Sequence, residues 1–104
     1  MSWLEPEPDP HARLAEEAVH AGVRAGQALQ RATAAQRSAA DSVQRSAESH
    51  ERTATSYELA AERSDQRATY LQHAARHRAY ADEDRRMAER LRQVAEGNAT
   101  GADR

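Results

Sequence analysis

The sequence of 104 residues contains no cysteine, no phenylalanine, no isoleucine and no lysine. The absence of cysteine excludes disulfides, thiolate metal ligands and cysteine catalysis. Six leucines, four valines, three tyrosines, two methionines and one tryptophan supply the large apolar side chains. They are too few for the core of a monomeric globule, which at this length would bury roughly 65% of its unfolded surface. The chain therefore either packs thin helices closely through alanine or borrows apolar contacts from a second copy.

The sequence also lacks a strong charge of one sign and any long apolar run. The formal net charge is −2. Acidic and basic residues are interspersed, so no strong field attracts nucleic acid or a membrane surface. The acidic, proline-rich residues 1–10 do not resemble a signal peptide, and no window approaches the length of a transmembrane span. We expect a cytoplasmic protein without membrane contact.

Proline is confined to the first ten residues. There it alternates with acidic residues, which predicts an extended tail over residues 1–9, because each residue before a proline is pushed out of the helical region. Asp9 followed by Pro10 predicts a helix start. Aspartate caps the free amide groups, and proline at the first helical position loses no hydrogen bond.

Glycine, the other helix breaker, is scarce as well. Gly22 and Gly26 each cost a helix about 1 kcal/mol relative to alanine and mark the weakest part of the first third. Neither glycine nor proline occurs between Gly26 and Gly97. Gly97 favours a helix cap. We therefore predict a helix over about 10–96 and a flexible tail over 97–104.

What the chain does contain is alanine at a fixed interval. Six alanines recur every seven residues: Ala40, Ala47, Ala54, Ala61, Ala68 and Ala75. Such spacing is typical of a helix that lays a narrow seam against another helix. After Ala75 the seam shifts back by one residue, to Ala74, Ala81, Ala88 and Ala95. A slip of this kind indicates a local adjustment in a coiled coil, or a bend.

These patterns predict an all-α fold. The arrangement that we favour is one long, nearly continuous alanine-rich helix over about 10–96, forming a coiled coil with another copy or a partner. The alternative is an antiparallel helical hairpin with a turn within 38–49, where serines compete with helical hydrogen bonds. The alanine ladder runs straight through 38–49, which favours the long helix. The predicted interaction seam consists of Ala47, Ala54, Tyr57, Ala61, Ala68, Leu71, Ala75, Ala88 and Leu91.

The histidines offer the candidate metal ligands. His73 and His77 lie four residues apart on one helical face, and Asp84 continues the same stripe, a spacing at which zinc ligands can lie. The glutamate of a zinc-protease helix is absent between them, and two arginines lie nearby. We therefore predict no metal site and no cofactor. If a metal were bound, His73, His77 and Asp84 would be its candidate ligands. His50 and, in the shifted register, His77 fall at seam positions, where neutral imidazoles can pack.

A set of arginines shares one heptad position: Arg24, Arg31, Arg45 and Arg52. A protein that binds the phosphate backbone would need such a stripe. The overall acidity and the lack of interleaved aromatic residues favour a solvated helix flank instead, so we do not expect nucleic acid as a partner. Nucleophilic catalysis has no support, since the chain has no cysteine and no serine framed by glycines. We expect no enzyme and no small-molecule substrate.

The segment Tyr80-Ala81-Asp82-Glu83-Asp84 places a tyrosine four residues before an acid near a helix end. It resembles the export motif of the small helical hairpin proteins that are handled by type VII secretion. Those proteins carry a Trp-x-Gly turn in mid-chain, whereas Trp3 of this chain is followed by Leu4 and Glu5. The resemblance implies an exported hairpin that forms a compact four-helix dimer.

The function that we expect is that of a non-enzymatic structural or interaction protein. It would act by self-association as a homo-oligomer, or by helix–helix contact with a helical protein partner. The alternatives are the exported hairpin and an accessory helix that associates with nucleic acid. Because alanine buries little area, at about 25 cal/mol per Å², we expect the association to be modest in strength.

Overall fold

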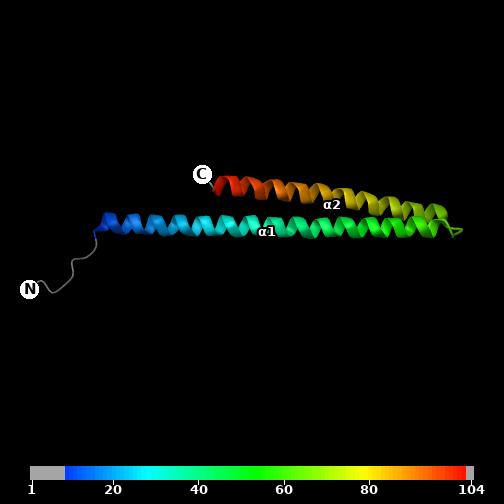
Figure 1. The fold of residues 1–104 in the computed structure, drawn as a ribbon, viewed down its shortest axis with the longest axis horizontal. Helices are drawn as coiled ribbons and strands as arrows, with labels where there is room; N and C mark the ends of the chain where they lie inside the picture. Colours follow the sequence, from blue (N-terminus) through cyan, green and yellow to red (C-terminus); the bar gives the residue numbers. More distant parts are fainter. Residues whose placement is uncertain (1–8, 103–104) are drawn as a thin grey trace, which may run out of the picture.

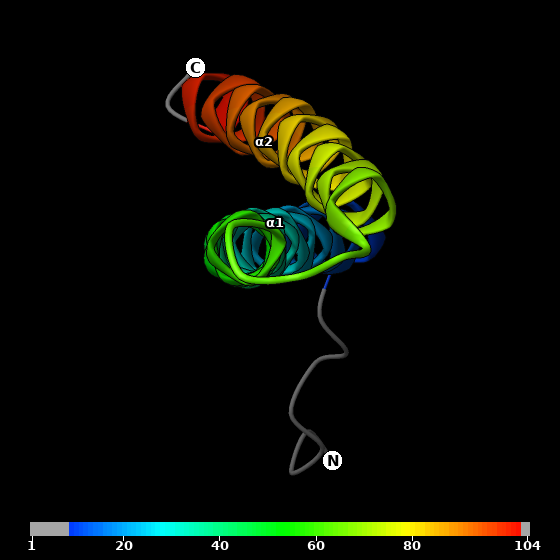
Figure 2. The ribbon, with the colours of Figure 1, turned by 90° about the vertical axis from the view of Figure 1, so that its right-hand side faces the viewer.

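The computed structural model of the protein describes residues 9–102, which form two α-helices. Helix α1 spans Pro10–Ala61 and helix α2 spans Arg67–Ala102. The helices lie side by side and antiparallel, in an elongated molecule with extents of 99 × 25 × 13 Å (Figures 1 and 2). Helix α1 reaches well beyond the C-terminal end of α2 (Figure 1). The all-α class is confirmed, and the chain adopts the hairpin arrangement.

The prediction of one continuous helix over 10–96 is wrong, and so is the alternative position of the turn within 38–49. Helix α1 passes through the serine-rich stretch and ends at Ala61. Hydroxyl groups inside α1 donate to the carbonyl four residues earlier, as Thr53 does to Ser49 and Ser56 does to Arg52. Both of these side chains follow the stretch 38–49. Within the stretch, the hydroxyl of Ser42 accepts from the guanidinium of Arg45 at 3.1 Å, and the backbone stays helical throughout.

The turn between the helices occupies residues 62–66 and uses neither glycine nor proline. No residue in the described part of the chain, glycine included, has a positive φ. The backbone N–H groups of Glu62 and Arg63 donate to carbonyls three residues earlier. The hydroxyl of Ser64 accepts from the N–H of Gln66 at 3.0 Å. The turn thus satisfies its backbone locally with ordinary residues, which is why a search for glycine and proline missed it.

Eight alanines form the buried seam between the helices. Each is at most 2% exposed: Ala40, Ala47, Ala54, Ala61, Ala74, Ala81, Ala88 and Ala95. Each helix therefore presents one alanine to its neighbour every two turns. Thr33 continues the interval on α1 and is also buried, with its hydroxyl donating to the carbonyl of Leu29 at 3.0 Å. Side chains this small allow the two backbones to approach closely.

The structure divides the predicted seam residues into two groups. Ala47, Ala54, Ala61 and Ala88 lie in the seam, and Tyr57 and Leu91 are half-buried at its edge. The remaining three are exposed on α2: Ala68, Leu71 and Ala75. After the turn, the buried position resumes at Ala74, one residue before Ala75. The one-residue shift of the alanine interval in the sequence therefore reflects the change from α1 to α2, and not an adjustment within a single helix.

The start of α1 follows the prediction from the sequence, whereas the end of α2 does not. At the start of α1, a side-chain oxygen of Asp9 accepts a hydrogen bond from the N–H of His11 at 3.1 Å, as a capping residue does. Helix α2 continues through Gly97 and ends at Ala102. The amide of Asn98 donates to the side-chain oxygen of Gln36 on α1 at 2.8 Å, so this last part of α2 still contacts its neighbour.

The predicted tails lie mostly outside the part of the chain that the structure describes. The extended tail was predicted over 1–9, of which only Asp9 is described, as the cap of α1. The flexible tail was predicted over 97–104, of which 97–102 are helical and 103–104 fall outside the described residues.

Candidate functional site

Two lines of side chains border the alanine seam, one on each side. We call the first the His–Tyr flank, which is half-buried and repeats at intervals of seven: Gln36, Val43, His50 and Tyr57 on α1, and Tyr70, His77, Asp84, Leu91 and Asn98 on α2. We call the second the charged flank, which joins acids on α1 to arginines on α2: Asp41, Glu51, Glu58, Arg78, Arg85 and Arg92. The His–Tyr flank and the arginines of the charged flank repeat with the seam, as do Glu51 and Glu58, whereas Asp41 lies outside this interval. The repeating contacts report the register of the hairpin.

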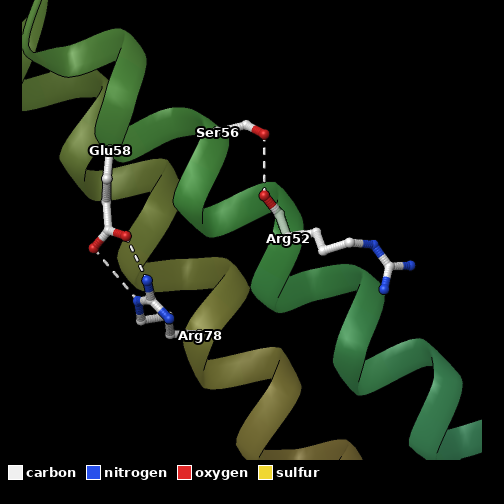
Figure 3. A network of polar contacts seen from close by, with 4 residues as sticks. All are labelled: Arg52, Ser56, Glu58 and Arg78. Carbon is white, nitrogen blue, oxygen red and sulfur yellow. Dashed lines mark hydrogen bonds and ion pairs between the residues drawn. The ribbon is translucent and has the colours of Figure 1, made fainter.

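The charged flank is a ladder of ion pairs. Arg78 pairs with Glu58 (Figure 3), and Arg85 pairs with Glu51, one heptad farther along each helix. The hydrogen bond from Arg85 lowers the pKa of Glu51 below its ordinary value, and the same bond raises the pKa of Arg85. These side chains are well exposed to solvent, so each pair stabilises the hairpin only slightly. Their main effect is to favour one register over its neighbours.

The predicted arginine stripe lies on the outside of α1. Arg24, Arg31, Arg45 and Arg52 are all exposed. Figure 3 shows the guanidinium of Arg52 pointing away from α2, while Glu58 of the same helix reaches toward Arg78. The stripe is thus a solvated face of the helix and takes no part in the pairing of α1 with α2.

The His–Tyr flank contains the shortest polar contact between imidazoles in the described residues. The Nδ1 atoms of His50 and His77 lie 2.9 Å apart, so one ring donates its proton to the other. On the far side of the His50 ring, Nε2 lies 4.0 Å from Oδ2 of Asp84. That carboxylate oxygen is shielded from solvent and has no hydrogen-bond partner in the structure. A buried acceptor without a partner is unusual enough to require an explanation.

Aromatic rings fill the space beside the pair. Tyr57 stacks against Tyr70 on one side and His77 on the other, with ring centroids 6.0 and 5.7 Å apart. The ring of His73 lies 5.0 Å from that of Tyr57. Tyr80 meets His77 edge to face at 5.9 Å. Such contacts contribute beyond the area that they bury, and they hold the two imidazoles in place where the alanine seam offers no bulk.

The predicted metal candidates do not converge on one point. His73 lies against Tyr57, whereas His77 faces His50 and Asp84 lies beyond it. Within residues 9–102, no group of three or more His, Cys, Asp or Glu side chains is arranged to hold a metal ion. Sequence reasoning placed His50 and His77 at seam positions but did not pair them across two helices, because they are 27 residues apart.

The surface of α1 that packs on α2 continues past the end of α2. Counting back in sevens from the buried alanines extends the seam and its two flanks into residues 12–30. We call this continuation the open face: Ala12, Ala15, Val19, Gly22, Val23, Gly26 and Leu29, bordered by Glu16 and Gln30. Val19 is 63% exposed and Val23 55%. A Cβ added at either glycine of the open face would meet nothing within 4 Å, so nothing among the described residues covers this face.

Neither helix in the described part of the chain is long and apolar enough to cross a membrane. No family model, no curated protein and no solved structure matches the chain.

Proposed function

We propose that the protein is a non-enzymatic helical interaction protein that self-associates through the open face of α1. One observation carries the proposal: the surface that binds α2 over residues 33–61 continues, exposed, across residues 12–30. Within the chain, this pattern of small residues is complementary to a second helix. The same pattern without a covering helix favours docking of another helix there.

The composition of the open face favours a second copy as that helix. Glu16 is the one charged residue along it, so the face offers little charge to select a foreign partner. A regular surface of small residues with little charge is complementary to itself, and self-complementary surfaces form two-fold dimers. If two copies pair antiparallel, as the two helices of the hairpin do, Val19 of each copy lies near the two-fold axis. Ala12 of one copy then lies opposite Gly26 of the other.

Sedimentation of the full chain and of two variants tests this proposal. We expect the wild type to form a dimer whose population rises with concentration, because the small contact area gives modest affinity. Val19→Arg places a charge at the centre of the contact, so this variant is expected to remain monomeric with unchanged helix content by circular dichroism. Ala21→Arg is the matched control, because residue 21 projects from the opposite side of the helix, and this variant is expected to dimerise normally.

Two results would contradict the proposal. The first is a wild type that stays monomeric at every concentration. The second is a dimer that survives Val19→Arg, which would place the contact on another side of α1 or along both helices.

The exported hairpin is the second candidate, and the hairpin arrangement itself favours it. Its motif residues lie in the middle of α2, where Tyr80 packs on His50 and Asp84 faces the same ring. The turn at 62–66 carries no tryptophan or glycine. A compact four-helix dimer would be held along both helices, so it would survive Val19→Arg. The sedimentation experiment therefore separates the two candidates.

A further inference from the structure

The His50–His77 pair takes no part in the proposed self-association, because it lies on the paired half of the hairpin. Two imidazoles whose Nδ1 atoms lie 2.9 Å apart share a single proton in the structure. The same geometry brings two strong nitrogen ligands, from two different helices, to a common point. A transition-metal ion placed there would replace the shared proton.

The separation of the two nitrogens is that of an ordinary hydrogen bond, and it also suits one class of metal geometry. Imidazole nitrogens bind such ions at about 2.0–2.1 Å. Two of them at neighbouring right-angle positions lie about 2.9 Å apart, whereas two in a tetrahedron lie about 3.3 Å apart. The observed 2.9 Å between the Nδ1 atoms of His50 and His77 fits the right-angle arrangement. Nitrogen ligands in square-planar or tetragonal positions are typical of Cu²⁺ and Ni²⁺.

Asp84 supplies an independent reason for this assignment. A histidine that binds metal through Nδ1 carries its proton on Nε2, and that N–H usually faces a carboxylate or carbonyl. Nε2 of His50 faces the shielded, unpartnered Oδ2 of Asp84 at 4.0 Å, which is too long for a hydrogen bond but close enough to favour a proton on Nε2. The carboxylate thus favours the form of His50 whose Nδ1 is free to bind metal.

The surrounding charges are compatible with a cation. Asp84 is the acidic group that faces His50. The nearby Arg78 is engaged by Glu58 on the opposite side of the alanine seam, where it opposes a cation little. The side chain of His50 is 30% exposed, so water can reach the pair and fill the other metal positions.

We propose that His50 and His77 form a two-histidine site for a divalent transition-metal ion of tetragonal geometry, with Cu²⁺ as the tightest-binding representative. Nδ1 of each imidazole binds the ion, water completes the coordination, and Asp84 is a positioning residue that orients His50. Within residues 9–102 no group of three or more such side chains is arranged around an ion, so the protein supplies two ligands and no more. Because the ligands come from α1 and α2, the ion links the two arms of the hairpin.

Titration of the full chain with Cu²⁺ in competition with a chelator tests this site. We expect one ion per chain and two nitrogen donors in the electron paramagnetic resonance spectrum. Binding is also expected to raise the temperature of half-unfolding by several degrees, because an ion that binds the folded hairpin stabilises it by mass action. His50→Ala and His77→Ala should each abolish the site and the rise. His50→Gln, which keeps a polar side chain of similar bulk, guards against a variant that fails to fold.

His73→Ala is the matched control, since His73 lies one turn from His77 but faces Tyr57. It should leave the affinity and the rise in unfolding temperature unchanged. If His73→Ala removes the site while His50→Gln retains it, the ion is held by His73 and His77 on α2 alone, and the proposal is overturned. It is also overturned if the wild type binds Cu²⁺ no better than a variant lacking both His50 and His77. Neither readout depends on self-association.

Discussion

Helix α1 has two halves that carry the same seven-residue repeat but differ in whether α2 packs on them. Over residues 33–61 the repeat is covered by α2, whereas over residues 10–32 it has no covering helix in the described part of the chain. The seam positions are mostly small in both halves, since Ala47 in one corresponds to Gly26 in the other, and Val19 is the larger exception in the open half. A small residue every seven positions therefore permits a close helix contact without deciding which helix makes it.

The flanks distinguish the two halves. Beside the covered seam stand His50 and Tyr57 on one side and Glu51 and Glu58 on the other. Beside the open seam the equivalent positions carry small or apolar residues, one amide and one acid: Ala15, Glu16, Gly22, Val23, Leu29 and Gln30. Directional contacts of imidazole, aromatic and charged groups are therefore confined to the half that recognises α2. They select one partner and one register, which alanine methyl groups cannot do.

Large apolar side chains do not explain the difference. Leu59 in the covered half is 58% exposed and Val19 in the open half is 63% exposed. The covered half gains its stability from close approach of the backbones and from the flanks, because the buried alanines each remove little apolar area from water. The hairpin is therefore expected to be sensitive to any added bulk in its seam.

The largest effect is expected from bulk in the covered seam. Ala81→Leu adds three carbons at a position with no exposed surface, and overpacking of this kind typically destabilises by about 1–3 kcal/mol. Ala75→Leu makes the same change on the exposed side of α2 and is expected to stay within about 0.5 kcal/mol of the wild type. Urea unfolding monitored by circular dichroism measures both. Equal losses in the two variants would contradict the assigned seam.

An intermediate effect is expected in the open half. Gly22→Ala and Gly26→Ala should each stabilise the helix by up to about 1 kcal/mol, because the added Cβ meets no neighbour within 4 Å. Hydrogen exchange of the backbone amides of residues 14–30, measured at high dilution, is expected to slow, while exchange in residues 40–60 stays the same. If the exchange rates of residues 14–30 are unchanged in both variants, the prediction is contradicted, and the helicity of this half must depend on contacts from outside the single hairpin.

The smallest effect is expected at the charged flank. Arg85→Gln removes the hydrogen bond that lowers the pKa of Glu51, so that pKa should rise toward its ordinary value of 4.5. Because the folded-state pKa is lowered, the stability due to this pair is present above pH 4.5 and is lost as the pH falls through the folded-state pKa. Carbon-detected NMR titration of Glu51 in both proteins measures the change. A Glu51 titration that Arg85→Gln leaves unmoved would disprove the pair in solution.

Much of the hairpin could be predicted from local patterns. The start of α1 followed from Asp9 and Pro10, because capping depends on neighbouring residues alone. The intervals of seven contain all eight buried alanines, but the predicted interaction seam named only four of them, Ala47, Ala54, Ala61 and Ala88, and it also included the exposed Ala68 and Ala75. The position of His50 and His77 at the border of the seam followed from the same counting. Their approach to 2.9 Å did not, because it depends on how one helix is placed along the other.

Local sequence patterns did not predict the position of the turn. Residues 62–66 contain ordinary polar residues, whereas the serine-rich stretch at 38–49 looked more like a break and stayed helical. Ala61, Ala68 and Ala75 continue the ladder through the turn, yet only Ala61 is buried. A seven-residue repeat can thus continue in the sequence across a turn between two helices, because the turn at 62–66 leaves the interval between the alanines unchanged.

Local patterns along the chain indicated that it is helical, where its helical part begins, and which side of α1 is small enough to pack. These properties arise from propensity, capping and periodicity, all of which act over a few residues. Only the tertiary structure decided that α1 ends at Ala61, that α2 covers one half of it, and that His50 meets His77. The physical reason is that alanine surfaces have nearly the same shape everywhere. Their pairing is therefore set by the sum of distant flank contacts across both helices.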